Sequence, residues 1–272
     1  MIFDMNTSHS ILIPLSEILL EVDIAVLGSV SAGYPAEAYN YIEEPVDVNR
    51  YISNRLFSPM CTWATNSHMT GEGIALGDLI VIDAKKEPND NSIILFNVGD
   101  GFRLDRFFKY GDGAELTPIN PKLSPLILQD EPLIKKGVVT FVIKKFSVYN
   151  SGYGLLPSDV ENYIEDGMDF NKYVLDDGFW ETTFYLWSGG DSMNGDGIEK
   201  GDLLVVDKLK EWNHDSILVF RIDGQYTIKR LVEHKDYNEL ISSNPDYPAM
   251  RFDKNVDLKV WGVLTAVVKR YS

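Results

Sequence analysis

Short apolar runs separated by polar loops dominate the chain and predict a mainly β fold. The runs "DLIVID" (78–83) and "DLLVVD" (202–207) are rich in β-branched residues, have strand length and are each followed by a polar loop. The segment "FRIDGQYTIKRL" (220–231) predicts a β-hairpin with Asp223-Gly224 at its turn. Patterns that allow short helices occur at 14–22, 40–52 and 162–174. We therefore expect β-sheets accompanied by short helices.

The same pattern is written twice along the chain. "WATNSHMTGEGIALGDLIVID" (63–83) returns as "WSGGDSMNGDGIEKGDLLVVD" (187–207), at a constant offset of 124 positions. "KGVVTFVIKKFS" (136–147) likewise returns as "WGVLTAVVKRYS" (261–272). This period is too long for a solenoid repeat, so it indicates two fused domains facing each other as an intramolecular pseudo-dimer.

The repeat predicts three parts. Residues 1–32 form an N-terminal arm, residues 33–147 the first copy and residues 148–272 the second copy. These names are kept throughout.

Charge and composition exclude several classes of protein. The net charge of -16 repels phosphate backbones, so we expect no direct binding of nucleic acid. The N-terminus lacks a basic segment and acidic residues interrupt its apolar runs, which argues against a signal peptide or a membrane span. The single cysteine, Cys61, excludes an intramolecular disulfide and fits the cytoplasm, and we expect it to be a buried apolar residue.

Ser192 stands among glycines and acidic residues and is the first candidate for chemistry. A serine hydroxyl becomes a good nucleophile only when a base takes its proton. None of the four histidines lies in a catalytic motif, and the G-x-S-x-G elbow is missing. Lys229 can serve as the base if burial lowers its pKa, and strand alternation places it on one face with Thr227 and Leu231. Without Lys229 the segment around Ser192 would be interpreted as a glycine-rich loop. A calcium-binding loop is not expected, because the acidic residues do not fit the EF-hand register.

The run "GDSMNGDGIEKGDLLVVD", followed by "TIKRL", resembles the self-cleaving Ser-Lys peptidase family of LexA, UmuD and the phage repressors. The resemblance extends over both copies and implies that Ser192 is the nucleophile and Lys229 the general base. It also implies an oxyanion hole made by the backbone N–H groups of Asp191 and Ser192. We expect the preceding Gly189-Gly190 to adopt unusual backbone angles.

Members of this family cleave themselves between a small residue and a glycine. The resemblance therefore implies a cleavage site at Ala32-Gly33, within "VSAGYP", where Val30 supplies an apolar residue upstream. Ser151-Gly152 occupies the equivalent place before the second copy and is the second choice. Cutting at Ala32-Gly33 would release the arm, as in UmuD.

The first copy carries His68 and Asp105 where the second carries the serine and the lysine. Neither replacement can perform the original role, so we expect the first copy to be inert. A metal site built on this pair would need further ligands, and we expect no metal and no cofactor.

The resemblance also implies a cellular role. A UmuD-like product would regulate an error-prone DNA polymerase of the Y family during the SOS response, with the RecA filament promoting cleavage. Two alternatives remain open, namely a non-proteolytic scaffold and a regulator from a mobile genetic element that pairs with a LexA-like or UmuD-like host protein.

Overall fold

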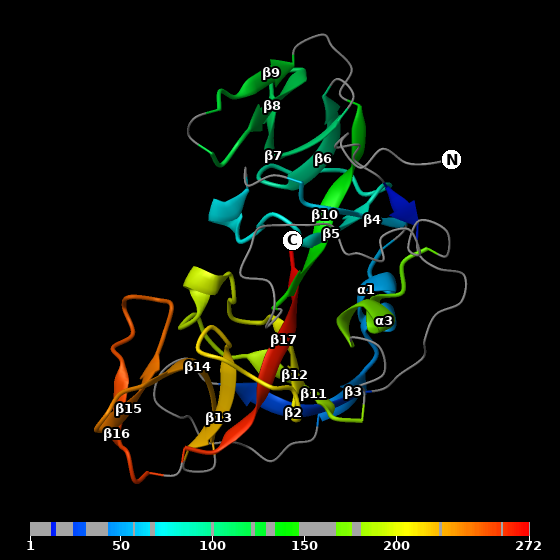
Figure 1. The fold of residues 1–272 in the computed structure, drawn as a ribbon. Coiled ribbons are helices and arrows are strands. Elements are labelled where there is room, and N and C mark those ends of the chain that lie inside the picture. The colour runs from blue at the N-terminus through cyan, green and yellow to red at the C-terminus, as the bar shows by residue number, and fades with distance from the viewer. Residues whose placement is uncertain are drawn as a thin grey trace, which may run out of the picture.

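The computed structural model shows two similar β domains joined through long strands (Figure 1). It describes residues 12–14, 24–30, 43–56, 58–65, 69–98, 101–120, 123–128, 134–146, 167–175, 181–222, 225–256 and 258–271. No helix in these ranges is long and apolar enough to cross a membrane.

In the described part of the first copy, seven strands pair antiparallel in the order β4-β5-β10-β6-β7-β8-β9. In chain order they are β4 (Pro59–Trp63), β5 (Leu79–Asp83), β6 (Ile93–Val98), β7 (Gly101–Tyr110), β8 (Gly113–Thr117), β9 (Leu126–Leu128) and β10 (Lys135–Lys145). A further strand, β3 (Glu43–Val46), pairs with the arm instead. The 3₁₀ turn η1 (Thr70–Glu72) lies between β4 and β5. Cys61 on β4 is buried, as expected, and this burial raises the pKa of its thiol to about 12.

The second copy repeats this arrangement strand for strand, in the order β11-β12-β17-β13-β14-β15-β16. Its strands are β11 (Thr183–Ser188), β12 (Leu203–Asp207), β13 (Leu218–Ile222), β14 (Gln225–Glu233), β15 (Tyr237–Ile241), β16 (Met250–Asp253) and β17 (Val260–Arg270). The turn η2 (Asn194–Asp196) corresponds to η1. Strands β13 and β14 form the predicted hairpin, whose turn residues 223–224 lie outside the described residues. The mainly β tandem fold is confirmed.

Two short helices form where the patterns at 40–52 and 162–174 allow them. They are α1 (Val48–Ser53) and α3 (Phe170–Val174), and an aspartate caps each: Asp47 accepts a bond from Arg50 N (2.8 Å) and Asp169 one from Lys172 N (3.0 Å). The pattern at 14–22 falls almost wholly outside the described residues.

Strands β10 and β17 join the two copies side by side at the centre of the molecule (Figure 1). Ile143 lies opposite Val268, and these two residues occupy equivalent positions in the repeat. A pseudo-twofold axis therefore passes between them, as an isologous interface requires. Each strand leads into the other copy: Phe146 packs on a core cluster of the second copy, and the Tyr271 hydroxyl donates to the Glu72 carbonyl in the first (2.6 Å).

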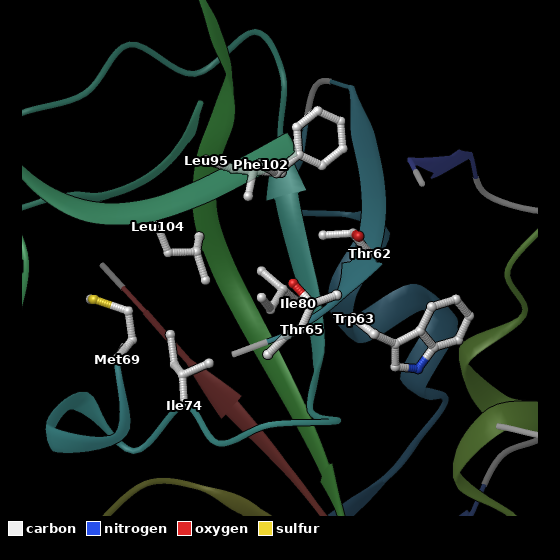
Figure 2. Close-up of a pocket in the computed structure, with 10 residues that line it drawn as sticks. Thr62, Trp63, Thr65, Met69, Ile74, Ile80, Leu95, Phe102 and Leu104 are labelled. Atoms are coloured by element: carbon white, nitrogen blue, oxygen red, sulfur yellow. The ribbon is translucent and has the colours of Figure 1, made fainter. Parts of the chain in front are cut away.

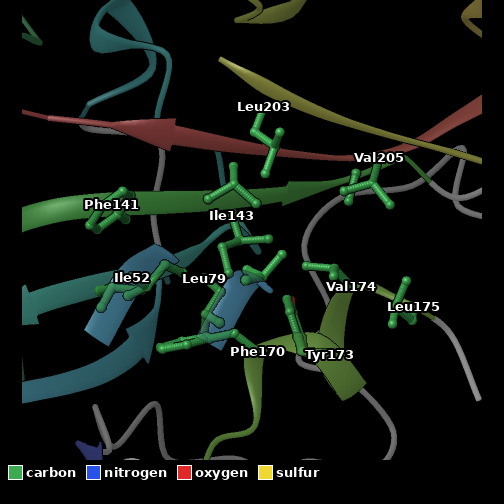
Figure 3. Packing of buried hydrophobic residues seen from close by; sticks show 14 of the residues in the cluster. Ile52, Leu79, Phe141, Ile143, Phe170, Tyr173, Val174, Leu175, Leu203 and Val205 are labelled. Atoms are coloured by element: carbon green, nitrogen blue, oxygen red, sulfur yellow. The ribbon is translucent and has the colours of Figure 1, made fainter. Parts of the chain in front are cut away.

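One apolar core lies between the copies and is built from both of them (Figure 3). At its edge α1 and α3 exchange buried hydrogen bonds. The Asn171 side chain accepts from Val48 N (2.8 Å), and the Asn49 side chain accepts from Phe170 N (2.7 Å). The reciprocal bonds confirm the pseudo-dimer and fix the orientation of the copies.

The described parts of the arm pair with both copies. β1 (Ile13–Pro14) runs antiparallel to β4. β2 (Ile24–Val30) lies between β11, to which it is parallel, and β3 (Glu43–Val46), to which it is antiparallel. The strand just before the predicted cleavage site is therefore part of the second copy's sheet.

Candidate active site

Ser192 lies in the connection that leaves β11 and enters η2. Gly197 has φ +79° and ends η2 in the left-handed region, where glycine is strongly favoured. Ile198 then enters the core cluster of the second copy. These constraints turn the chain sharply, and Ser192 is only 2% exposed.

Lys229 lies on β14, opposite Leu218 of β13. Its Nζ is 2.8 Å from Ser192 Oγ and 2.9 Å from the carbonyl oxygen of Ile228. The lysine is only 1% exposed, and the loss of hydration lowers its pKa from 10.5 to about 8. A neutral amine at this distance can accept the serine proton, so the structure brings together the two residues that the sequence singles out.

A loop after β15 holds the serine turn in place. Asn244 N donates to the Ser192 carbonyl (3.0 Å), and the Asn244 side chain donates to the Asp191 carbonyl (3.1 Å). The Tyr247 hydroxyl donates to the Asp191 carboxylate (2.5 Å). Gly195 passes so close to Ser243 that a Cβ there would lie 2.5 Å from its carbonyl oxygen. The peptide groups on either side of the nucleophile candidate are thus fixed.

An ion pair ties the lysine strand to the serine turn. Arg230 donates to both carboxylate oxygens of Asp196, at 2.6 and 2.7 Å. In the first copy Arg106 pairs with Glu72, at the same two positions of the repeat. A bidentate pair restricts both side chains, so it fixes the distance between β14 and η2.

The expectation for Gly189 and Gly190 is wrong, because neither has a positive φ. The left-handed glycines are Gly197 and Gly201, which follow the serine. The reason is that the chain continues directly from β11 into this segment and reverses only after η2. An oxyanion hole formed by the N–H groups of Asp191 and Ser192 stays a prediction.

The first copy has a different set of charges at the equivalent place. Asp105 is fully buried on β7, and Arg103 Nε donates to its carboxylate (3.1 Å). Arg103 occupies the position of Thr227, and Asp105 that of Lys229. A buried carboxylate held by an arginine cannot replace a neutral amine that accepts a proton. His68 lies outside the described residues.

A pocket opens beside this position in the first copy (Figure 2). Met69 and Leu104 line it, and they correspond to Met193 and Ile228, the neighbours of Ser192 and Lys229. In the second copy these two counterparts belong to a cluster against which Leu27 of β2 packs. The equivalent surface of the second copy is therefore in contact with the arm.

The arm approaches the serine along β11. Val30 pairs with Ser188, four residues before Ser192, and β2 also lies beside β14. Ala32 and Gly33 follow immediately but lie outside the described residues, as do Ser151 and Gly152. The described strand places the chain just before the first-choice cleavage site at the end of β11, four residues before Ser192.

Sequence reasoning missed the roles of Asn244, Tyr247 and the pair formed by Arg230 and Asp196. A signal for the asparagine was present, because "INP" at 119–121 returns as "SNP" at 243–245 with the offset of the repeat. Glu72 and Arg106 repeat the acid and the arginine at the same offset. Features kept in both copies, although the chemistry differs, indicate residues that maintain the fold of the turn.

Comparisons with known proteins match both copies to one family. The family model described as Peptidase S24-like matches twice, at residues 25–140 and 145–265. Protein ImpA of Salmonella typhimurium is 35% identical over 115 residues, which are 42% of this chain and 76% of ImpA. Protein MucA of the same species is 32% identical over 110 residues, 40% of this chain and 73% of MucA. LexA repressor 1 of Pseudomonas syringae is 29% identical over 130 residues, 46% of this chain and 62% of that repressor.

Proposed function

We propose that this chain, which belongs to the Peptidase S24-like family, is a UmuD-like serine peptidase that cleaves itself. Ser192 is the nucleophile and Lys229 the general base. The observation that carries this proposal is the 2.8 Å contact between Lys229 Nζ and Ser192 Oγ, both of which are buried.

The reaction begins with the neutral amine of Lys229. It takes the proton of Ser192 as Oγ attacks the carbonyl carbon of Ala32, and the N–H groups of Asp191 and Ser192 stabilise the oxyanion. Lys229 then gives its proton to the nitrogen of Gly33, which leaves as an amine, and Ala32 remains as an ester on Ser192. Water, deprotonated by Lys229, hydrolyses the ester and restores the serine.

The substrate segment belongs to the same chain. The pairing of Val30 with Ser188 supports attack within one molecule, because β2 is already a strand of the second copy's sheet. The arm supplies the segment that is cut, the first copy supplies the pseudo-symmetric partner, and the second copy supplies the chemistry. Ser151-Gly152 remains the second choice of cleavage site.

The cellular role follows from the relatives. ImpA and MucA are UmuD-like, which supports a role in an error-prone polymerase system. The processed form would regulate a Y-family DNA polymerase in the cytoplasm during the SOS response, with the RecA filament promoting cleavage. Co-purification of the processed form with such a polymerase tests this role. If the polymerase co-purified with neither the processed nor the uncut protein, the result would count against it.

The self-cleavage is tested by the intact mass of the purified protein after incubation at pH 7 to 10. Weighed under denaturing conditions, the wild type should yield a chain that begins at Gly33, while Ser192→Ala and Lys229→Ala should stay whole. Ser124→Ala and Lys172→Ala, at an exposed serine of the first copy and an exposed lysine of α3, should behave as the wild type. Activity in cells that survives Ser192→Ala would favour a scaffold, and a cut in that variant would exclude the mechanism.

A further inference from the structure

The bond between Ala32 and Gly33 lies in the connection between two strands that are paired with each other. β2 ends at Val30 and β3 begins at Glu43. Ile24 lies opposite Val46, and Val26 opposite Glu43. A cut in this connection breaks the chain but removes none of the hydrogen bonds between the two strands.

β2 is an interior strand, with β11 on one side and β3 on the other. Ile24 and Val26 belong to the apolar core between the two copies, and Val26 has no exposed surface. Leu27 packs against a second cluster, which contains Met193 and Ile228, the neighbours of Ser192 and Lys229 in the sequence. If β2 left this site, apolar surface of both clusters and the backbone N–H and C=O groups of β11 and β3 would become exposed to water.

A second contact holds the arm on the other copy. β1 pairs with β4, and Leu12 packs on the cluster that contains Met69 and Leu104 of the first copy. One arm therefore contacts equivalent clusters of both copies. Two attachments on one segment hold it more firmly than either alone, because release of one leaves the other in place.

We infer that the arm stays bound after cleavage, with the β11 edge and the Leu27 contact as the binding surface for the fragment 1–32. The inference rests on the proposed cleavage. The product is then a two-chain protein in which β2 still pairs with β11 and β3.

Charge does not hold the arm. The fragment has four acidic residues and no lysine or arginine, and the remainder of the chain is also acidic, with 37 acidic and 25 basic residues. Their net charges therefore repel each other, and this repulsion weakens as ionic strength rises. Retention that depends on apolar contacts and strand pairing should be undiminished in high salt.

The test separates retention from self-cleavage. In the Ser192→Ala chain, a recognition sequence for an added site-specific protease is placed between residues 34 and 42, and the cut protein is passed over a size-exclusion column and weighed by native mass spectrometry. The same is done with self-cleaved wild type. We expect both fragments to travel as one complex, at low and at high salt. Elution of the large fragment alone would overturn the inference.

Substitutions then locate the binding surface. Leu27→Asp should make release of the cut arm at least tenfold faster, while Leu209→Asp, the same change at a leucine that is 75% exposed, should not change it. Leu27→Ser provides a milder second variant in case the aspartate prevents folding. If the cut arm were released at the same rate from Leu27→Ser as from the wild type, Leu27 would not be part of the binding surface. Absence of cleavage in wild type would overturn the proposed function only, since the added protease still tests retention.

Discussion

Self-cleavage should accelerate with pH along the titration of Lys229. With its pKa lowered to about 8, the amine is neutral in about one molecule in ten at pH 7 and about nine in ten at pH 9. A fully hydrated lysine of pKa 10.5 would be neutral in only about one molecule in 3,000 at pH 7. The rate should therefore rise about tenfold from pH 7 to pH 9 and then level off.

The assay follows the intact mass over time at half-unit steps from pH 6 to 10. Lys229→Ala should show no cleavage at any pH, and Lys172→Ala should reproduce the wild-type profile. A rate independent of pH would refute the role of Lys229 as base. A rate still rising about tenfold per pH unit up to pH 10 would show that burial does not lower the pKa of Lys229.

The same titration affects stability. Because the folded-state pKa lies below that of the unfolded lysine, the unfolded chain binds more protons between about pH 8 and 10.5, and the free energy of unfolding rises with pH over this window. Lys229→Met should therefore stabilise the protein by about 3 kcal/mol at pH 7 but by only about 1 kcal/mol at pH 10. Urea denaturation of both proteins measures this, and an advantage that does not shrink with pH would contradict it.

Three further predictions concern the frame around the site. Asn171→Ala should lower the free energy of unfolding by about 1 to 3 kcal/mol in urea denaturation, because a buried N–H of α1 loses its acceptor; no loss would refute the interface. Gly195→Ala should slow self-cleavage, since its Cβ would meet the carbonyl of Ser243 at 2.5 Å, and an unchanged rate would show that the turn tolerates movement. Asp105→Ala should lower the free energy of unfolding by about 1 to 3 kcal/mol, because the partly buried Arg103 loses its charged hydrogen-bond partner. The rate of self-cleavage should stay unchanged, and a slower rate would give the first copy a role in the chemistry.

Much of the fold follows from local patterns. The apolar runs define strands, aspartates cap the two helices, and the repeat requires that both copies have the same strand order. The pairing of Ser192 with Lys229 was also predictable, although they are 37 residues apart, because the resemblance to the Ser-Lys peptidase family assigns a role to each. Alternation along β14 placed the lysine on one face with Thr227 and Leu231, but only the structure shows that it is buried.

Other features depend on contacts that no local pattern encodes. The parallel pairing of β2 with β11 joins segments far apart in the chain, and nothing in the arm indicates its partner. The repeated Asn-Pro signal marks Asn244 as a structural residue, but its contact with the Ser192 turn depends on how the loop after β15 returns to the site. The positions of left-handed glycines could not be inferred either, because they depend on where the chain reverses, which occurs at Gly197 rather than before the serine.

A mixing experiment tests the central claim, that the second copy cuts the arm of its own chain. Unlabelled wild type is incubated at pH 9 with an equal amount of heavy-isotope-labelled Ser192→Ala, and both are weighed under denaturing conditions over a range of dilutions. The account predicts that the unlabelled chain alone acquires a new N-terminus at Gly33, at a rate independent of concentration. Cleavage of the labelled chain, or an intact unlabelled chain, would contradict it.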